Sequence, residues 1–74
     1  MSIQAVQALA NAIIIKAAKD YRIALKRQLR NPGSEKANHD IKEIVRFFRS
    51  KWFSCLTTID GEYLIERLRK EVGA

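Results

Sequence analysis

The stretch KAAKDYRIALKRQLRNPGS, residues 16–34, decides the fold of this chain. Up to Arg30 it contains no Pro or Gly, and its apolar side chains recur at the spacing of one helical face. Asn31-Pro32-Gly33 then ends the helix, because proline lacks a backbone N–H and glycine favours turns. Ser34 follows in the position of an N-cap. The stretch therefore predicts two helices joined by a tight turn.

Toward the N-terminus the chain stays free of Pro and Gly back to Ser2, which stands where an N-cap is expected. This predicts one long helix over residues 2–30, about 42 Å in length. At about 100° per residue, one face of it is apolar. The residues on that face are Ile3, Val6, Ala10, Ile13, Ile14, Ala17, Tyr21, Ala24 and Leu25. We expect this face to contact the core.

Beyond the turn, a second helix is predicted from Ser34 to about Ser50. Its apolar face consists of Ala37, Ile41, Ile44, Val45 and Phe48, with Trp52 following in phase. Residues 51–59 mix aromatic, small and β-branched side chains, which indicates a short helical turn and a loop whose aromatic rings fill the core. We expect Phe48 and Trp52 to be buried.

Asp60 is a good N-cap for a last helix, with Glu62 at its positive end and Arg69 and Lys70 at its negative end. The apolar stripe of this helix is Leu64, Ile65, Leu68 and Val72. Residues 1–74 are therefore expected to form a single helical domain. Its fold class is all-α, a three-helix antiparallel hairpin-like bundle with one long N-terminal helix. The second helix is expected to pack on the C-terminal half of the first helix, and the third on its N-terminal half.

Three apolar residues point away from the predicted core stripe of the first helix: Leu9, Ile15 and Ile23. A single core in a chain of 74 residues supplies only about 3–5 kcal/mol unless disulfides, metal or oligomerisation add to it. These residues therefore predict a homodimer through the first helix. The alternative is that they are scattered surface residues, which are normal in monomers.

Few side chains are suited to catalysis or metal binding. Cys55 is the only cysteine and His39 the only histidine, and there is no glycine-rich phosphate loop. Among its apolar neighbours Cys55 is expected to be a buried thiol, and His39 an exposed surface residue. We therefore predict a protein that is not an enzyme, with no catalytic residue, no metal site and no cofactor.

Charge gives the stronger signal, because the net charge is +6. Residues 16–30 carry six basic side chains against Asp20, and residues 41–51 carry four against Glu43. Such segments attract phosphates, so DNA or RNA is the leading partner, with an exposed Phe47 stacking on an unpaired base. The alternative is that these basic residues only solvate the helices. The candidate nucleic-acid-binding residues are Lys19, Arg22, Lys26, Arg30, Arg46 and Arg49.

Several segments resemble small prophage and mobile-element proteins of Gram-positive bacteria. They are Asp20-Tyr21-Arg22, Ala24-Leu25-Lys26, Arg46-Phe47-Phe48-Arg49-Ser50, Trp52-Phe53 and Asp60-Gly61-Glu62-Tyr63-Leu64-Ile65. The resemblance covers most of the chain and implies a phage protein in the bacterial host cytoplasm, but it transfers no catalytic residue.

Small proteins of such elements commonly act by binding. The alternative partner is therefore a host or phage protein that this chain binds or inhibits, and a third class is a structural or packaging accessory. No membrane association is expected, because Gln4, Gln7 and Asn11 interrupt the uncharged N-terminal stretch.

Overall fold

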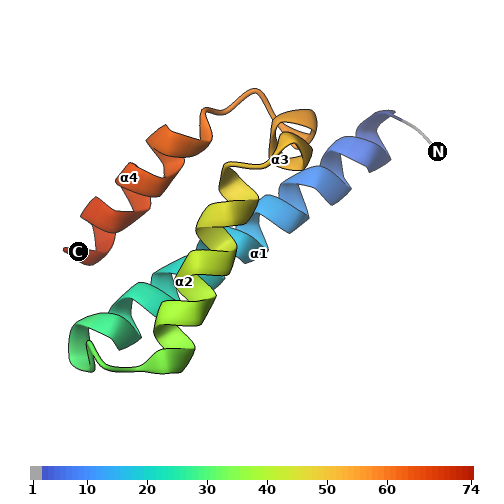
Figure 1. Ribbon diagram of the computed structural model, residues 1–74. Helices are drawn as coiled ribbons and strands as arrows, with labels where there is room; N and C mark the ends of the chain where they lie inside the picture. The colour runs from blue at the N-terminus through green and yellow to red at the C-terminus, as the bar shows by residue number, and fades with distance from the viewer. Residues whose placement is uncertain (1–2) are drawn as a thin grey trace.

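The computed structural model describes residues 3–74, which form four helices and no strand. The helices are α1 (Ile3–Arg30), α2 (Glu35–Phe48), α3 (Lys51–Leu56) and α4 (Gly61–Val72). The three longer helices alternate in direction: α2 returns along the second half of α1, and α4 runs back beside both (Figure 1). The molecule measures 44 × 20 × 19 Å, and its long dimension matches the length of α1, about 42 Å. The all-α bundle with a long first helix is confirmed.

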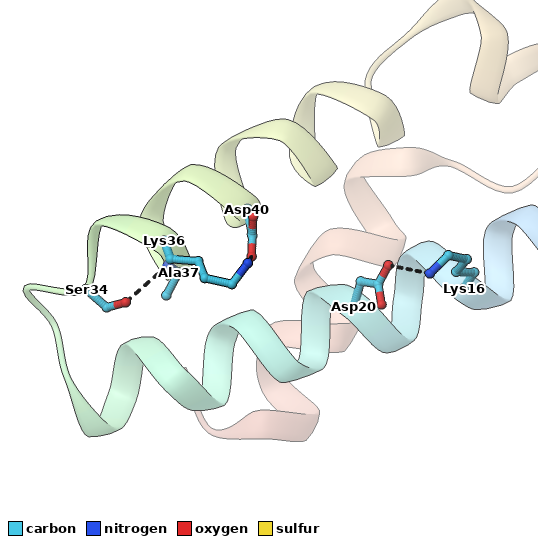
Figure 2. A network of polar contacts seen from close by, with 6 residues as sticks. All are labelled: Lys16, Asp20, Ser34, Lys36, Ala37 and Asp40. Carbon is cyan, nitrogen blue, oxygen red and sulfur yellow. Dashed lines mark hydrogen bonds and ion pairs between the residues drawn. The ribbon is translucent and has the colours of Figure 1, made fainter.

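Side-chain hydrogen bonds cap the first turns of α2 and α4, as the sequence predicts. The Ser34 side chain accepts a hydrogen bond from the backbone N–H of Ala37 at 3.2 Å (Figure 2). Asp60 Oδ1 accepts one from the N–H of Glu62 at 3.0 Å. Both caps satisfy N–H groups that have no partner inside their own helix. The predicted cap Ser2 lies outside the described residues.

The placement of the last helix differs from the prediction. It was expected to cover the N-terminal half of α1, but α4 lies beside the second half, where Glu71 in its last turn reaches Arg22. The reason is α3, which turns the chain back before α4 begins, so that only α3 lies against the first turns of α1. The predicted placement followed from the lengths of the three longer helices and did not include the reversal of the chain at α3.

The core lies between α2, α4 and the part of α1 from Ile14 onward, and α3 adds Phe53 to it. Its largest fully buried side chains are Tyr21, Leu25, Phe48, Phe53 and Leu68. On α1 the predicted stripe is buried at Ala10, Ile14, Tyr21, Ala24 and Leu25 and half-buried at Ile13 and Ala17. Val6 is exposed, which corrects the prediction, because it lines an open groove beside α3 and is not covered by it. The side chain of Ile3 lies outside what the structure describes.

A change of helical phase after Phe48 reverses the expected roles of two aromatic residues. α2 ends there, and Ser50 caps the new helix α3 by accepting a hydrogen bond from the N–H of Phe53 at 3.1 Å. Phe53 is consequently buried, whereas Trp52 is 59% exposed. The prediction of a buried Trp52 assumed one continuous helical phase and is wrong. The short helical turn followed by a loop is confirmed.

Two further predictions, those for Phe47 and Cys55, are wrong, and the one for His39 is confirmed. Phe47 is half-buried rather than exposed, because its ring lies 5.4–5.7 Å from the rings of Phe48, Trp52 and Phe53. Cys55 is exposed rather than buried, since α3 turns it away from the core. His39 is exposed, as predicted.

Candidate nucleic-acid interface

The outer face of the second half of α1 carries an aligned set of basic side chains. Lys19, Lys26 and Arg30 lie within about 40° of one another around the helix, at rises of about 10 and 6 Å. All three are exposed. Among residues 3–74, none of them forms an ion pair with an acidic side chain. We call Lys19, Lys26 and Arg30 the α1 basic stripe.

Arg22 and Arg49, two of the predicted nucleic-acid-binding residues, form ion pairs that join helices. Arg22 Nε donates to Glu71 Oε2 at 2.9 Å and so links α1 to the last turn of α4. Arg49 Nε donates to Glu62 Oε1, and its Nη2 donates to Oε2 at 3.3 Å, which links the end of α2 to the first turn of α4. The hydrogen bond and the charge of Glu62 raise the pKa of Arg49. Both guanidinium groups are thus engaged by carboxylates in the folded chain.

The remaining predicted residue, Arg46, lies on α2 with a second basic group. Its Nη1 is 4.0 Å from Glu43 Oε1, at the limit for an ion pair. Lys42, Arg46 and Arg49 line one hollow of about 780 Å³ together with Ile41 and Val45. Lys42 was missed as a site residue, although its spacing of four from Arg46 places both on one helical face.

The six predicted residues do not form one patch across the α1–α2 hairpin. A hydrogen bond of 2.9 Å between Gln28 and Asn38 fixes the register of the two helices. It places Arg46 near the level of Asp20, about 15 Å along the axis from Arg30.

Acidic side chains also lie between the two groups. Asp20, Asp40 and Glu43 line the hollow between α1 and α2, together with the basic residues Arg27 and Lys36. Lys16 pairs with Asp20 at 3.3 Å and Lys36 with Asp40 at 3.6 Å (Figure 2). The candidate site therefore divides into the α1 basic stripe and the group on α2, with carboxylates between them on this side.

Neither a metal cluster nor a membrane span is found within residues 3–74. No three histidine, cysteine, aspartate or glutamate side chains are grouped to hold a metal ion there. No helix in the same range has both the length and the apolar composition needed to cross a bilayer. Comparison of the chain with protein-family models, curated proteins and solved structures finds no match. The resemblance to prophage proteins stays a prediction.

Proposed function

We propose that this chain is a non-enzymatic nucleic-acid-binding protein that contacts phosphates through the α1 basic stripe. The observation that supports this most is the contrast among its basic residues. Lys19, Lys26 and Arg30 are exposed on one face without an acidic partner in the described chain, whereas Arg22 and Arg49 are held by Glu71 and Glu62. Unpaired cations on a helix face attract a polyanion without first having to break an ion pair.

The proposed mechanism is stoichiometric occupancy of the phosphate backbone. Each lysine or arginine that neutralises a phosphate releases a condensed counterion, and this release supplies the binding free energy. Phosphate contacts position a protein but do not read bases, so binding of DNA and of RNA follows from the same chemistry. From the resemblance of the sequence, we place this activity in the cytoplasm of a bacterium carrying the phage or mobile element.

The salt dependence of affinity tests the proposal. Three phosphate contacts on duplex DNA give a slope of about −2.7 in a plot of log affinity against log salt. Lys26→Glu should reduce the magnitude of this slope by about 0.9 and weaken binding to unrelated sequences alike. The measurement is fluorescence anisotropy of labelled oligonucleotides across a salt series.

Lys70→Glu is the matched control, because it changes the net charge equally but lies on α4, where Lys70 is 3.7 Å from Glu66. Equal losses for Lys26→Glu and Lys70→Glu would show that only net charge matters. Absence of binding to any DNA or RNA at about 10 μM protein in about 50 mM salt would contradict the proposal, because those conditions favour even non-specific association.

A second candidate function is that of a module that binds or inhibits a host or phage protein. It is favoured by the exposed apolar side chains Val6, Leu9 and Trp52, which lie together at one end of the molecule. Purification of the tagged protein from its host, before and after nuclease treatment, separates the two functions. Nucleic acid that is lost on treatment supports the first, and a stoichiometric protein retained after treatment supports the second.

A further inference from the structure

The first turns of α1 and the short helix α3 enclose an apolar groove. It is lined mainly by Val6, Leu9, Ile13, Trp52, Cys55 and Leu56, with the polar side chain of Gln7 also on its wall, and its volume is about 340 Å³. Leu9 is 57% exposed and Trp52 is 59% exposed, although both are large apolar side chains. No charged residue lines the groove, and residues 3–15 contain none at all. In a sequence of net charge +6, residues 1–15 are the longest run without a charged side chain.

The exposed area of the molecule is too large for a compact monomer. The chain exposes 5516 Å², whereas a folded monomer of 8.5 kDa is expected to expose about 4,650 Å². The excess over the whole molecule, about 870 Å², is close to the roughly 800 Å² that each partner buries in a protein interface of standard size. A second protein chain covers an area of this size.

The absence of charge indicates which kind of protein surface can bind in the groove. The groove offers no acidic or basic group to a charged partner. The N-terminal half of α1 is uncharged and rich in apolar residues, so a second copy of it matches the groove. We propose that the groove is the interface of a two-fold homodimer, in which this half of α1 from each copy packs antiparallel against the groove of the other. A two-fold interface uses the same patch twice, so the patch must complement itself.

The antiparallel arrangement also separates like charges. With the crossing centred near Leu9, the two copies of Lys16 lie on opposite sides of it, about 20 Å apart along the helices. That distance is more than twice the screening length of about 8 Å at physiological salt. The two copies of Lys16 therefore repel each other only weakly in this arrangement.

This interface differs from the one predicted from sequence. Leu9 belongs to it, but Ile15 lies about 120° away around α1, and Ile23 lies about 21 Å further along the helix, in the hollow that contains Asp20. Ile15 and Ile23 are 54% and 56% exposed, nearly the same as Leu9. They are therefore matched controls of the same size, exposure and helix. Dimer formation through this groove is independent of the proposed nucleic-acid binding.

Sedimentation equilibrium from about 1 to 100 μM tests the interface on the full chain. We expect a monomer–dimer equilibrium in the unaltered protein, and a dissociation constant raised at least about tenfold by Leu9→Glu, which places an unpaired carboxylate in the interface. Ile23→Glu and Ile15→Glu should leave it within about threefold. Circular dichroism confirms that each variant is folded, and Trp52→Ser serves as a second interface variant if Leu9→Glu is not.

Two native residues report on the same groove without mutation. Trp52 is the only tryptophan, so its emission should shift to shorter wavelength as concentration rises, and Cys55 should react more slowly with maleimide in the dimer. A strict monomer at 100 μM would overturn the proposal. So would a dimer that dissociates with Ile15→Glu or Ile23→Glu but not with Leu9→Glu, since that places the interface on the outer face of α1.

Discussion

The two halves of α1 form one continuous helix, yet they differ in almost every other property. Residues 16–30 carry six basic side chains and bury Tyr21 and Leu25 completely against α2 and α4. Residues 3–15 carry no charge and bury only Ala10 and Ile14 among the side chains described there. Helix propensity cannot explain the difference, because both halves are rich in alanine. What differs is which part of the rest of the chain covers each half.

The difference shows where the stability of the fold resides. Most helical stability in proteins comes from packing of an apolar face rather than from propensity. The second half of α1 therefore belongs to the bundle itself. The first half joins the core only at Ile14, and its earlier turns are a helical extension beside α3. Substitutions in the two halves should accordingly have very different costs.

The largest expected effect comes from displacing α4, which packs on the second half of α1. Gly61, the first residue of α4, lies so close to the end of α2 that an added Cβ would overlap the carbonyl oxygen of Phe48. Gly61→Ala should displace α4 and cost more than about 4 kcal/mol, about the whole stability of a domain of this size. Chemical denaturation followed by circular dichroism measures it.

Gly33→Ala is the matched control for Gly61→Ala. Its Cβ would meet only the Asn31 side chain at 3.7 Å, so stability should stay the same or rise by about 0.4–1 kcal/mol through loss of unfolded-state freedom. A stable Gly61→Ala protein with unchanged contacts between α4 and α1 would contradict the role given to this glycine.

Two leucines on α1 compare the halves directly. Leu25 is 0% exposed and Leu9 is 57% exposed, sixteen residues apart on one helix. Leu25→Ala should cost about 2–5 kcal/mol because it leaves a cavity in the core. Leu9→Ala should change the stability of the monomer by less than about 0.5 kcal/mol. Urea unfolding at low micromolar concentration gives both values, and equal costs would remove the distinction between the halves.

Amide hydrogen exchange should show the same contrast without mutation. Backbone amides of residues 20–25 should open only with global unfolding, whereas those of residues 8–12 should open at a free energy lower by about 1–2 kcal/mol. Residues 8–12 lie beyond the first turn, so each of these amides can bond within the helix. The measurement is made at low protein concentration, so that the protein is monomeric. Uniform protection of the amides along α1 would contradict the difference between its two halves.

The smallest effect concerns a defect in the better-packed half. Tyr21 is fully buried with its ring edge toward Phe48, but within the described chain its hydroxyl has no hydrogen-bond partner. A buried polar group without a partner costs free energy. Tyr21→Phe should therefore stabilise the fold by about 1 kcal/mol, seen as a higher urea midpoint. A loss of stability would show that the hydroxyl has a partner in solution.

Local features of the fold were predictable from sequence. The caps Ser34 and Asp60 and the Asn31-Pro32-Gly33 turn act within a few residues, so their signals are complete in the sequence. The same applies to the apolar stripe of α1 around Tyr21. These signals suffice for the helices and the α1–α2 hairpin.

Phase and pairing across the chain were not predictable. Ser50 caps a new helix that begins after only two non-helical residues, and this small break exchanges the roles of Trp52 and Phe53. Arg22 finds Glu71 across 49 positions, a pairing that depends on the path of α4. The exposed position of the α1 basic stripe was accordingly predictable from helical periodicity. The ion pairs of Arg22 and Arg49 depend on how the helices pack, so they were not. That these residues bind nucleic acid stays a prediction.

The hydrogen bonds around the turn also determine the order in which the fold can form. Gln28 and Asn38 are ten residues apart, and Asn38 and Pro32 are six residues apart. Closing the α1–α2 hairpin therefore costs little loop-closure entropy. The link between Arg22 and Glu71 must close a much longer segment. We therefore expect the hairpin to be formed in the folding transition state and α4 to dock after it. Substitutions that shorten side chains packed between α1 and α2 should slow folding. Loss of the Arg22–Glu71 ion pair should mainly speed unfolding.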